Sequence, residues 1–192
     1  GLADSTIVVL FGDHGFHLAD HGAFWAKHSN FDHATRTPLI VRVPGMQKPG
    51  TFDTPVGLVD AFPTLADLCS LPYPKQPNGL FLEGTSLLPL VEDPTQPWKK
   101  GVFSQYQRRI WKKNSAGDTV DINNPGNGIG YSIRTKRYRY TEWWRTETTA
   151  KDSKGNYTDR DVKLFNAPEM KELYDYNIEP NETTNLVNES SH

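Results

Sequence analysis

The segment that determines the fold class reads Ile7-Val8-Val9-Leu10-Phe11-Gly12-Asp13-His14-Gly15. Its first five residues are apolar, and most are β-branched or aromatic, which predicts a strand buried on both faces of a parallel sheet. Such a strand needs parallel neighbours joined by crossover helices, and few are available later in the sequence. We therefore expect the remaining strands of this sheet to come from a preceding portion of the protein or from another chain.

Asp13 and His14 are the first polar residues after this predicted strand. Ligands of open α/β sheets bind at the carboxyl ends of the strands. Carboxylate oxygens and imidazole nitrogens both bind divalent cations, so the pair is a candidate metal site. Two alternatives stay open from the residues alone: Asp13 as the cap of a following helix, and His14 as a hydrogen-bonded core histidine.

The following residues are unusually rich in histidine, with five of the six histidines of the chain between positions 14 and 33. His17, Asp20 and His21 resemble a ligand cluster, because the i, i+4 spacing places both imidazoles on one face of a helix. The glutamate of a His-Glu-x-x-His motif is missing, which argues against a zinc site. Lys27 is either an ordinary solvated lysine or a functional one, with Trp25 and Phe31 expected to hold its loop in place.

Three adjoining stretches, at 13–22, 25–32 and 34–41, resemble the sulfatases of the alkaline phosphatase superfamily, and among them the iduronate-2-sulfatase branch. Further matching stretches follow in order at 58–65, 103–106, 130–135, 138–141, 172–176 and 179–186. The resemblance implies a hydrolase of sulfuric esters that acts in glycosaminoglycan degradation. A 2-O-sulfated uronate of heparan or dermatan sulfate is the substrate that it implies.

The resemblance also implies roles for individual residues. Asp13 and His14 match metal ligands, His14 and Lys27 match catalytic residues, and Lys27 and Phe16 match residues that contact the substrate. Calcium is the implied ion, with magnesium as an alternative because histidine is a less usual ligand for calcium.

The family's nucleophile, a formylglycine made from cysteine in a Cys-x-Pro-Ser-Arg context, has no counterpart here. The single cysteine, Cys69, precedes Ser70-Leu71-Pro72 and is expected to be a buried structural thiol. We therefore expect the formylglycine in an N-terminal portion of the enzyme, which would be the partner of this chain around a sulfated glycan.

Two other functions stay open. The first is a metal-dependent phosphoesterase or phosphonate hydrolase of the same superfamily, with a different nucleophile and metal. The second is a remnant that binds glycans without turnover. The sequence around the nucleophile would distinguish a sulfatase from a phosphoesterase or phosphonate hydrolase.

The chain is expected to hold the C-terminal part of an alkaline-phosphatase-like parallel α/β domain at 1–97 and a small antiparallel α+β subdomain at 98–192. The expected elements are strands at 38–45, 101–106 and 171–176, a hairpin at 131–144, a helix at 60–71 capped by Asp60, a helical turn at 86–91, an exposed loop at 108–130 and a short helix at 185–188.

Composition limits the partners and the compartment. The net charge of −2 gives no support for a nucleic-acid partner, and the sequence has no apolar run long enough to span a membrane. One cysteine permits no internal disulfide. Glycosylation sequons at Asn156, Asn181 and Asn188 weakly favour secretion, and the resemblance implies a lysosome or a bacterial periplasm or exterior.

Overall fold

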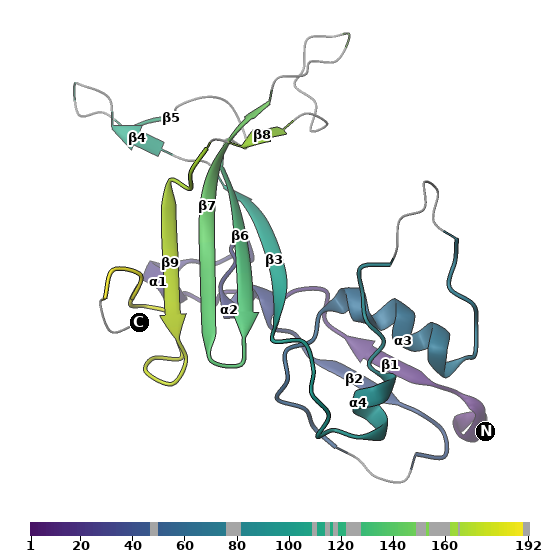
Figure 1. Cartoon of the computed structure of the whole chain (residues 1–192). Helices are drawn as coiled ribbons and strands as arrows, with labels where there is room; N and C mark the ends of the chain where they lie inside the picture. Colours follow the sequence, from purple (N-terminus) through teal and green to yellow (C-terminus); the bar gives the residue numbers. More distant parts are fainter. Residues whose placement is uncertain are drawn as a thin grey trace. The chain divides into compact units, whose positions relative to one another are not determined.

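The computed structural model describes residues 1–46, 50–75, 82–108, 111–113, 116, 119–121, 128–148, 153, 162–164 and 166–189. The chain forms two compact units (Figure 1). The first contains Gly1–Gly15 and Arg36–Val102, and the second contains Phe16–Thr35 and Phe103–His192. The boundary predicted after residue 97 lies near the end of the first unit, but residues 16–35 group with the second.

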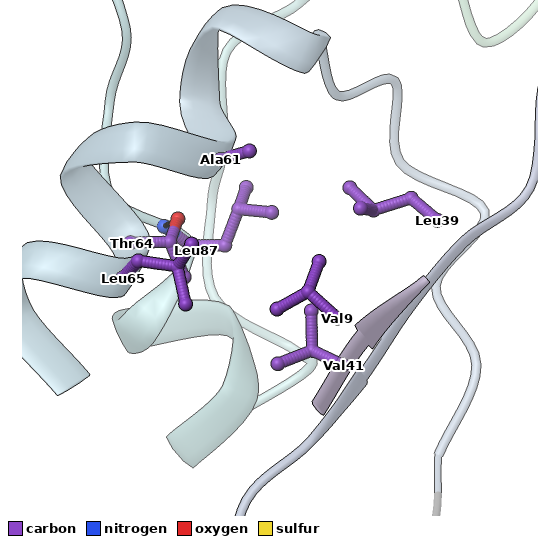
Figure 2. A pocket seen from close by; sticks show the side chains of 7 residues that line it. All are labelled: Val9, Leu39, Val41, Ala61, Thr64, Leu65 and Leu87. Carbon is purple, nitrogen blue, oxygen red and sulfur yellow. Dashed lines mark hydrogen bonds between the residues drawn. The ribbon is translucent and has the colours of Figure 1, made fainter. Parts of the chain in front are cut away.

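The first unit packs helices on one face of a two-stranded sheet. Strands β1 (Val8–Phe11) and β2 (Leu39–Arg42) pair antiparallel, with Val9 opposite Val41. Helix α3 (Ala61–Leu68) follows the 3-10 helices η1 (Ala3–Ser5) and η2 (Leu58–Asp60), and α4 (Leu88–Glu92) comes later. Figure 2 shows an apolar pocket between the layers, lined by Val9, Leu39 and Val41 on the strands and by Ala61, Thr64, Leu65 and Leu87 on the helical side.

The opposite face of the same two strands is open to solvent. Leu10 and Ile40 face each other across the ladder and are 55% and 59% exposed. The prediction that this strand is buried on both faces is therefore wrong for the chain by itself. The reason is that the helices of the unit cover only the face that carries Val9 and Val41.

Asp60 is buried, but it does not cap α3 through its side chain as predicted. Its carboxylate accepts hydrogen bonds from the backbone N–H groups of Gly57 at 2.8 Å and Thr85 at 2.9 Å. The ammonium of Lys99 lies 2.5 Å from the same carboxylate. Asp60 therefore joins three separate segments of the first unit, which satisfies a buried charge that a helix cap alone would leave partly unpaired.

The second unit is built on an antiparallel sheet. Its strands are β3 (Gly101–Arg108), β6 (Gly128–Thr135), β7 (Tyr138–Thr148), β8 (Val162–Leu164) and β9 (Met170–Asp175). The order is β3-β6-β7, after which β9 and β8 pair with different parts of the long strand β7 (Figure 1). The hairpin predicted from alternation around Lys136-Arg137 is confirmed as β6–β7.

Three local predictions need correction. Part of the loop predicted at 108–130 forms a short hairpin of β4 (Trp111–Lys113) and β5 (Thr119–Asp121). Residues 185–188 form a turn, because Asn185 bonds the backbone N–H groups of Leu173 and Val187 instead of starting a helix. Cys69 is exposed, because it follows the last residue of α3.

The histidine-rich segment is fixed to this sheet by a buried ionic network. The histidine-rich segment contains the short helices α1 (Asp20–Ala23) and α2 (Asp32–Thr35). The guanidinium of Arg139, in β7, lies 2.5 Å from Glu182 and 3.0 Å from Asp32. Asn30 also donates a hydrogen bond to the carbonyl of Gly130 in β6, at 3.1 Å. Burial opposes the charge of Arg139, but the Glu182 carboxylate, Tyr176 and Asp32 raise its pKa.

Candidate active site

Asp13 and His14 lie directly after β1, as predicted. The Oδ2 atom of Asp13 is 3.5 Å from the Nε2 atom of His14, and both side chains reach solvent. The backbone N–H of His14 donates to Oδ1 of Asp13 at 3.0 Å, which holds the carboxylate over the turn. Gly12 fits between β1 and the chain at Thr37, where a Cβ atom would lie 3.3 Å from the threonine side chain.

The hydrogen bond of the other ring nitrogen defines the tautomer of His14. Its Nδ1 atom lies 2.8 Å from the carbonyl oxygen of Gly15. A carbonyl oxygen only accepts, so Nδ1 carries a proton, and Nε2 lies on the side of Asp13. One oxygen and one nitrogen therefore face the same space, which is the arrangement that a shared cation needs.

The structure contradicts both alternatives for this pair, in which Asp13 caps a helix and His14 is a core histidine. The next helix, α1, begins at Asp20, and its N-cap is Ala19, so Asp13 caps no helix. His14 is exposed and is not a core histidine. The pair is therefore accessible to a ligand from solvent.

Phe16 and Lys27 belong to the second unit, whereas Asp13 and His14 belong to the first. The side chains of Phe16 and Lys27 are exposed. Phe16 contacts Trp25 edge-on, with ring centroids 6.4 Å apart. Trp25 is 66% exposed, so the expectation that it holds the Lys27 loop against the protein is wrong. Backbone hydrogen bonds shape the loop instead: the N–H of His17 donates to Ala26, and the N–H of Ser29 donates to Lys27.

The residues that resembled a ligand cluster do come together, although for a different reason than predicted. His17 lies outside α1, and His21 has a left-handed backbone at φ 49°, so no regular helix places the two on one face. A fourth side chain, that of His33, joins them from α2. Sequence spacing could not indicate His33, because its approach depends on how the segment folds back.

Solved structures with the same fold define the class of protein. A 2-O GAG sulfatase superposes with a TM-score of 0.64 at 25% identity, covering 98% of this chain and 33% of that chain. A phosphonate monoester hydrolase from Silicibacter pomeroyi gives a TM-score of 0.66 at 23% identity, covering 98% and 32%; this second likeness shows the fold alone. The fold is that of the alkaline phosphatase superfamily, and the predicted fold class is confirmed.

The family follows from sequence. The sulfatase family model matches residues 1–71. Human iduronate 2-sulfatase is 35% identical over 233 residues, covering 98% of this chain and 40% of that protein. The resemblance to the sulfatase family that the sequence predicted is confirmed by these two matches. The chain spans about 40% of the length of the curated relatives it matches.

Proposed function

We propose that the chain is the C-terminal portion of a sulfatase that removes sulfate from a sulfated sugar. The observation that carries this proposal is the Asp13–His14 pair, whose Oδ2 and Nε2 atoms lie 3.5 Å apart directly after β1. The pair falls inside residues 1–71, which match the sulfatase family model.

Asp13 and His14 are proposed to hold a divalent cation, with further ligands from the preceding portion of the enzyme. The carboxylate suits calcium, and magnesium is the alternative because a nitrogen ligand is unusual for calcium. A bound cation supplies charge that neutralises the sulfate oxygens and orients the nucleophile. The Nδ1–H bond to Gly15 supports this role, because it fixes the imidazole with Nε2 toward the cation.

Lys27 and Phe16 are proposed to act on the substrate. The Lys27 ammonium would stabilise negative charge on the sulfate oxygens as the ester bond breaks. The exposed ring of Phe16 offers an apolar surface for the sugar. The nucleophile, a formylglycine, is proposed to come from the preceding portion, since Cys69 stands in an unrelated context at the end of α3.

The substrate is proposed to carry its sulfate at a 2-position of a glycosaminoglycan uronate. Two similar proteins support this choice by their names: human iduronate 2-sulfatase and the 2-O GAG sulfatase. The sulfated glycan would then lie against Lys27 and Phe16.

The preceding portion of the enzyme is also the proposed partner of the open face of β1 and β2. Val8, Leu10 and Ile40 form an exposed apolar surface on this face. In the described part of the chain, β1 pairs only with β2, which leaves its other edge available for a further strand. Further parallel strands supplied by the preceding portion would extend the edge, and their crossover helices would cover the exposed apolar surface.

A lysosomal or secreted location is proposed from the sulfatase relatives and from the sequons. Asn181 and Asn188 are exposed, as glycan acceptors must be, while Asn156 lies outside the described residues. No helix within the described residues has the length and apolar character needed to cross a membrane.

The test of the metal assignment is Asp13→Ala in the complete enzyme. We expect loss of most bound calcium and of most sulfate release, with an unchanged circular dichroism spectrum because Asp13 is exposed. Asp4→Ala, which removes another exposed carboxylate of the first unit, should change neither quantity. Full activity and metal content in Asp13→Ala would remove the assignment.

A phosphonate or phosphate ester hydrolase is the second candidate, favoured by the likeness in fold to the phosphonate monoester hydrolase. Both activities could use a cation between Asp13 and His14. They differ in the ester that is cleaved, so a comparison of substrates separates them. Tight binding of a sulfated glycan without turnover would instead favour the non-catalytic alternative.

A further inference from the structure

A second group of metal-ligating side chains lies in the second unit, apart from the Asp13–His14 pair of the first unit. It consists of His17, Asp20, His21 and His33, whose ligand atoms all lie within 4.8 Å of one another. The Oδ2 atom of Asp20 is 3.5 Å from Nδ1 of His33 and 3.8 Å from Nε2 of His21. The same oxygen makes a short hydrogen bond with Nδ1 of His17.

Two of these atoms are buried without a hydrogen-bond partner, namely Nε2 of His21 and Nδ1 of His33. A buried polar atom without a hydrogen-bond partner is destabilising, so such atoms are uncommon unless a further ligand completes them. Both nitrogens face the same carboxylate oxygen at distances too long for a hydrogen bond. A cation between them would satisfy both at once.

The surrounding contacts hold these side chains in place. His17 is fully buried, and its Nε2 atom lies 2.7 Å from the hydroxyl of Ser29. The second oxygen of Asp20 accepts a hydrogen bond from the N–H of Leu18 at 2.8 Å. The ring of His21 stacks on Phe31 with centroids 4.1 Å apart. Outer contacts of this kind orient metal ligands and select their tautomers.

We propose that His17, Asp20, His21 and His33 form a zinc site. Three imidazole nitrogens and one carboxylate oxygen give a closed set of four ligands, and zinc takes nitrogen and carboxylate-oxygen ligands in tetrahedral geometry. Bonds of about 2.0–2.1 Å would place the ligand atoms roughly 3.4 Å apart, so the hydrogen-bonded pair of His17 and Asp20 must open while the longer separations, of up to 4.8 Å, contract. Three nitrogen ligands disfavour calcium and magnesium, which prefer oxygen.

In this site His17 binds through Nδ1 and carries its proton on Nε2, where the hydroxyl of Ser29 accepts it. The zinc ion joins residues 17–21 to His33, on either side of Lys27 in the sequence. Its role is therefore to stabilise this segment, and the site stands whether or not the chain acts on sulfate esters.

The test is a titration of the chelator-treated complete protein with zinc chloride, in a Cys69→Ser background that removes the exposed thiol. We expect His21→Ala and His33→Ala each to weaken zinc binding at this site by at least about tenfold and to abolish the rise in Tm that zinc causes. His28→Ala is the matched control, because His28 is exposed, lies in the same segment and bonds to Tyr106 instead. It should bind zinc as the parent does.

Two further measurements keep the outcome decisive. Asp20→Asn preserves the shape of the side chain, so loss of binding there cannot be attributed to a cavity. Anomalous diffraction at the zinc edge from soaked crystals of the parent should give a peak between the four side chains. Parent-like binding in both histidine variants, or no peak at this position, would overturn the proposal. If only His14→Ala lost zinc binding, the ion would lie at the Asp13–His14 pair, and the proposal would equally be overturned.

Discussion

At the scale of single residues, the chemistry of the proposed active site depends on which nitrogen of the His14 imidazole faces Asp13. Nδ1 of His14 lies 2.8 Å from the carbonyl oxygen of Gly15, and Nε2 lies 3.5 Å from Oδ2 of Asp13. The sequence predicts this pair because both residues directly follow an apolar strand. It could not predict the tautomer, nor the approach of His33 to Asp20, since both depend on local backbone turns that spacing does not encode.

Lys27→Ala is predicted to raise KM and lower kcat for a sulfated substrate. Its charge would act on the sulfate oxygens in the ground state and in the transition state, so both constants should change. Steady-state kinetics of the complete enzyme measures them, with Lys136→Ala as the control because Lys136 is an exposed turn lysine of the same unit. A change in Tm with unaltered kinetics would show that Lys27 is structural.

Glu172→Gln is predicted to stabilise the protein at neutral pH and to have less effect in acid. Burial in β9 raises the pKa of Glu172, so the folded state favours the protonated form. The native state is therefore most favoured below the ordinary pKa of glutamate, and this advantage is lost as the pH rises through the raised value.

The measurement is Tm against pH for Glu172→Gln and for the exposed control Glu189→Gln. The gain in Tm for Glu172→Gln should grow from acid to neutral pH, while the control stays near zero. A gain that is equal at all pH values would show that packing, and not ionisation, is responsible.

At the scale of elements, regular alternation predicted structure well. The β6–β7 hairpin follows from polar and apolar residues at every second position, and α3 follows from its apolar face. The burial of β1 was not predictable within this chain, because a run of apolar residues does not say which molecule covers each face. Residues 185–188 form a turn and not the predicted helix, because the Asn185 side chain makes hydrogen bonds to the backbone of strand β9.

Gly130→Ala is predicted to destabilise the second unit. A Cβ atom there would lie 2.7 Å from the amide of Asn30 and 2.8 Å from the ring of Trp143. Overpacking of this kind costs about 1–3 kcal/mol. Gly50→Ala is the control, since its Cβ atom would meet nothing within 4 Å. Denaturant unfolding should separate the two variants, and equal stabilities would mean that β6 and the Asn30 segment are less tightly packed than described.

Leu10→Glu tests the proposed cover of the β1–β2 face. Leu10 is 55% exposed in this chain, so a charge there should alter its stability little. In the complete enzyme, the proposed cover would bury Leu10, so replacing it by a charged residue should lower the free energy of unfolding by roughly 2–5 kcal/mol. Leu2→Glu is the control, at a residue 78% exposed in the same unit. Similar small effects of both variants in the complete enzyme would show that the face stays open.

At the scale of the whole molecule, the chain spans about 40% of the length of the sulfatase relatives it matches. Its sequence predicted the family and the antiparallel sheet of the second unit, because the strand-end motif and the hairpin are local features. The parallel sheet expected around β1 is not seen in the described residues, where β1 pairs antiparallel with β2. The sequence could not supply the nucleophile or the remaining metal ligands, because the chain spans about 40% of the relatives' length. The proposed active site is therefore a joint product of this chain and the preceding portion.

The most direct measurement is the product released by the complete enzyme from matched substrates. A 2-O-sulfated uronate disaccharide should yield free sulfate, with far lower turnover of phosphate and phosphonate esters, and the release should fall when calcium is removed. Preferential cleavage of a phosphonate or phosphate ester, or tight binding of the sulfated disaccharide without any sulfate release, would contradict the account.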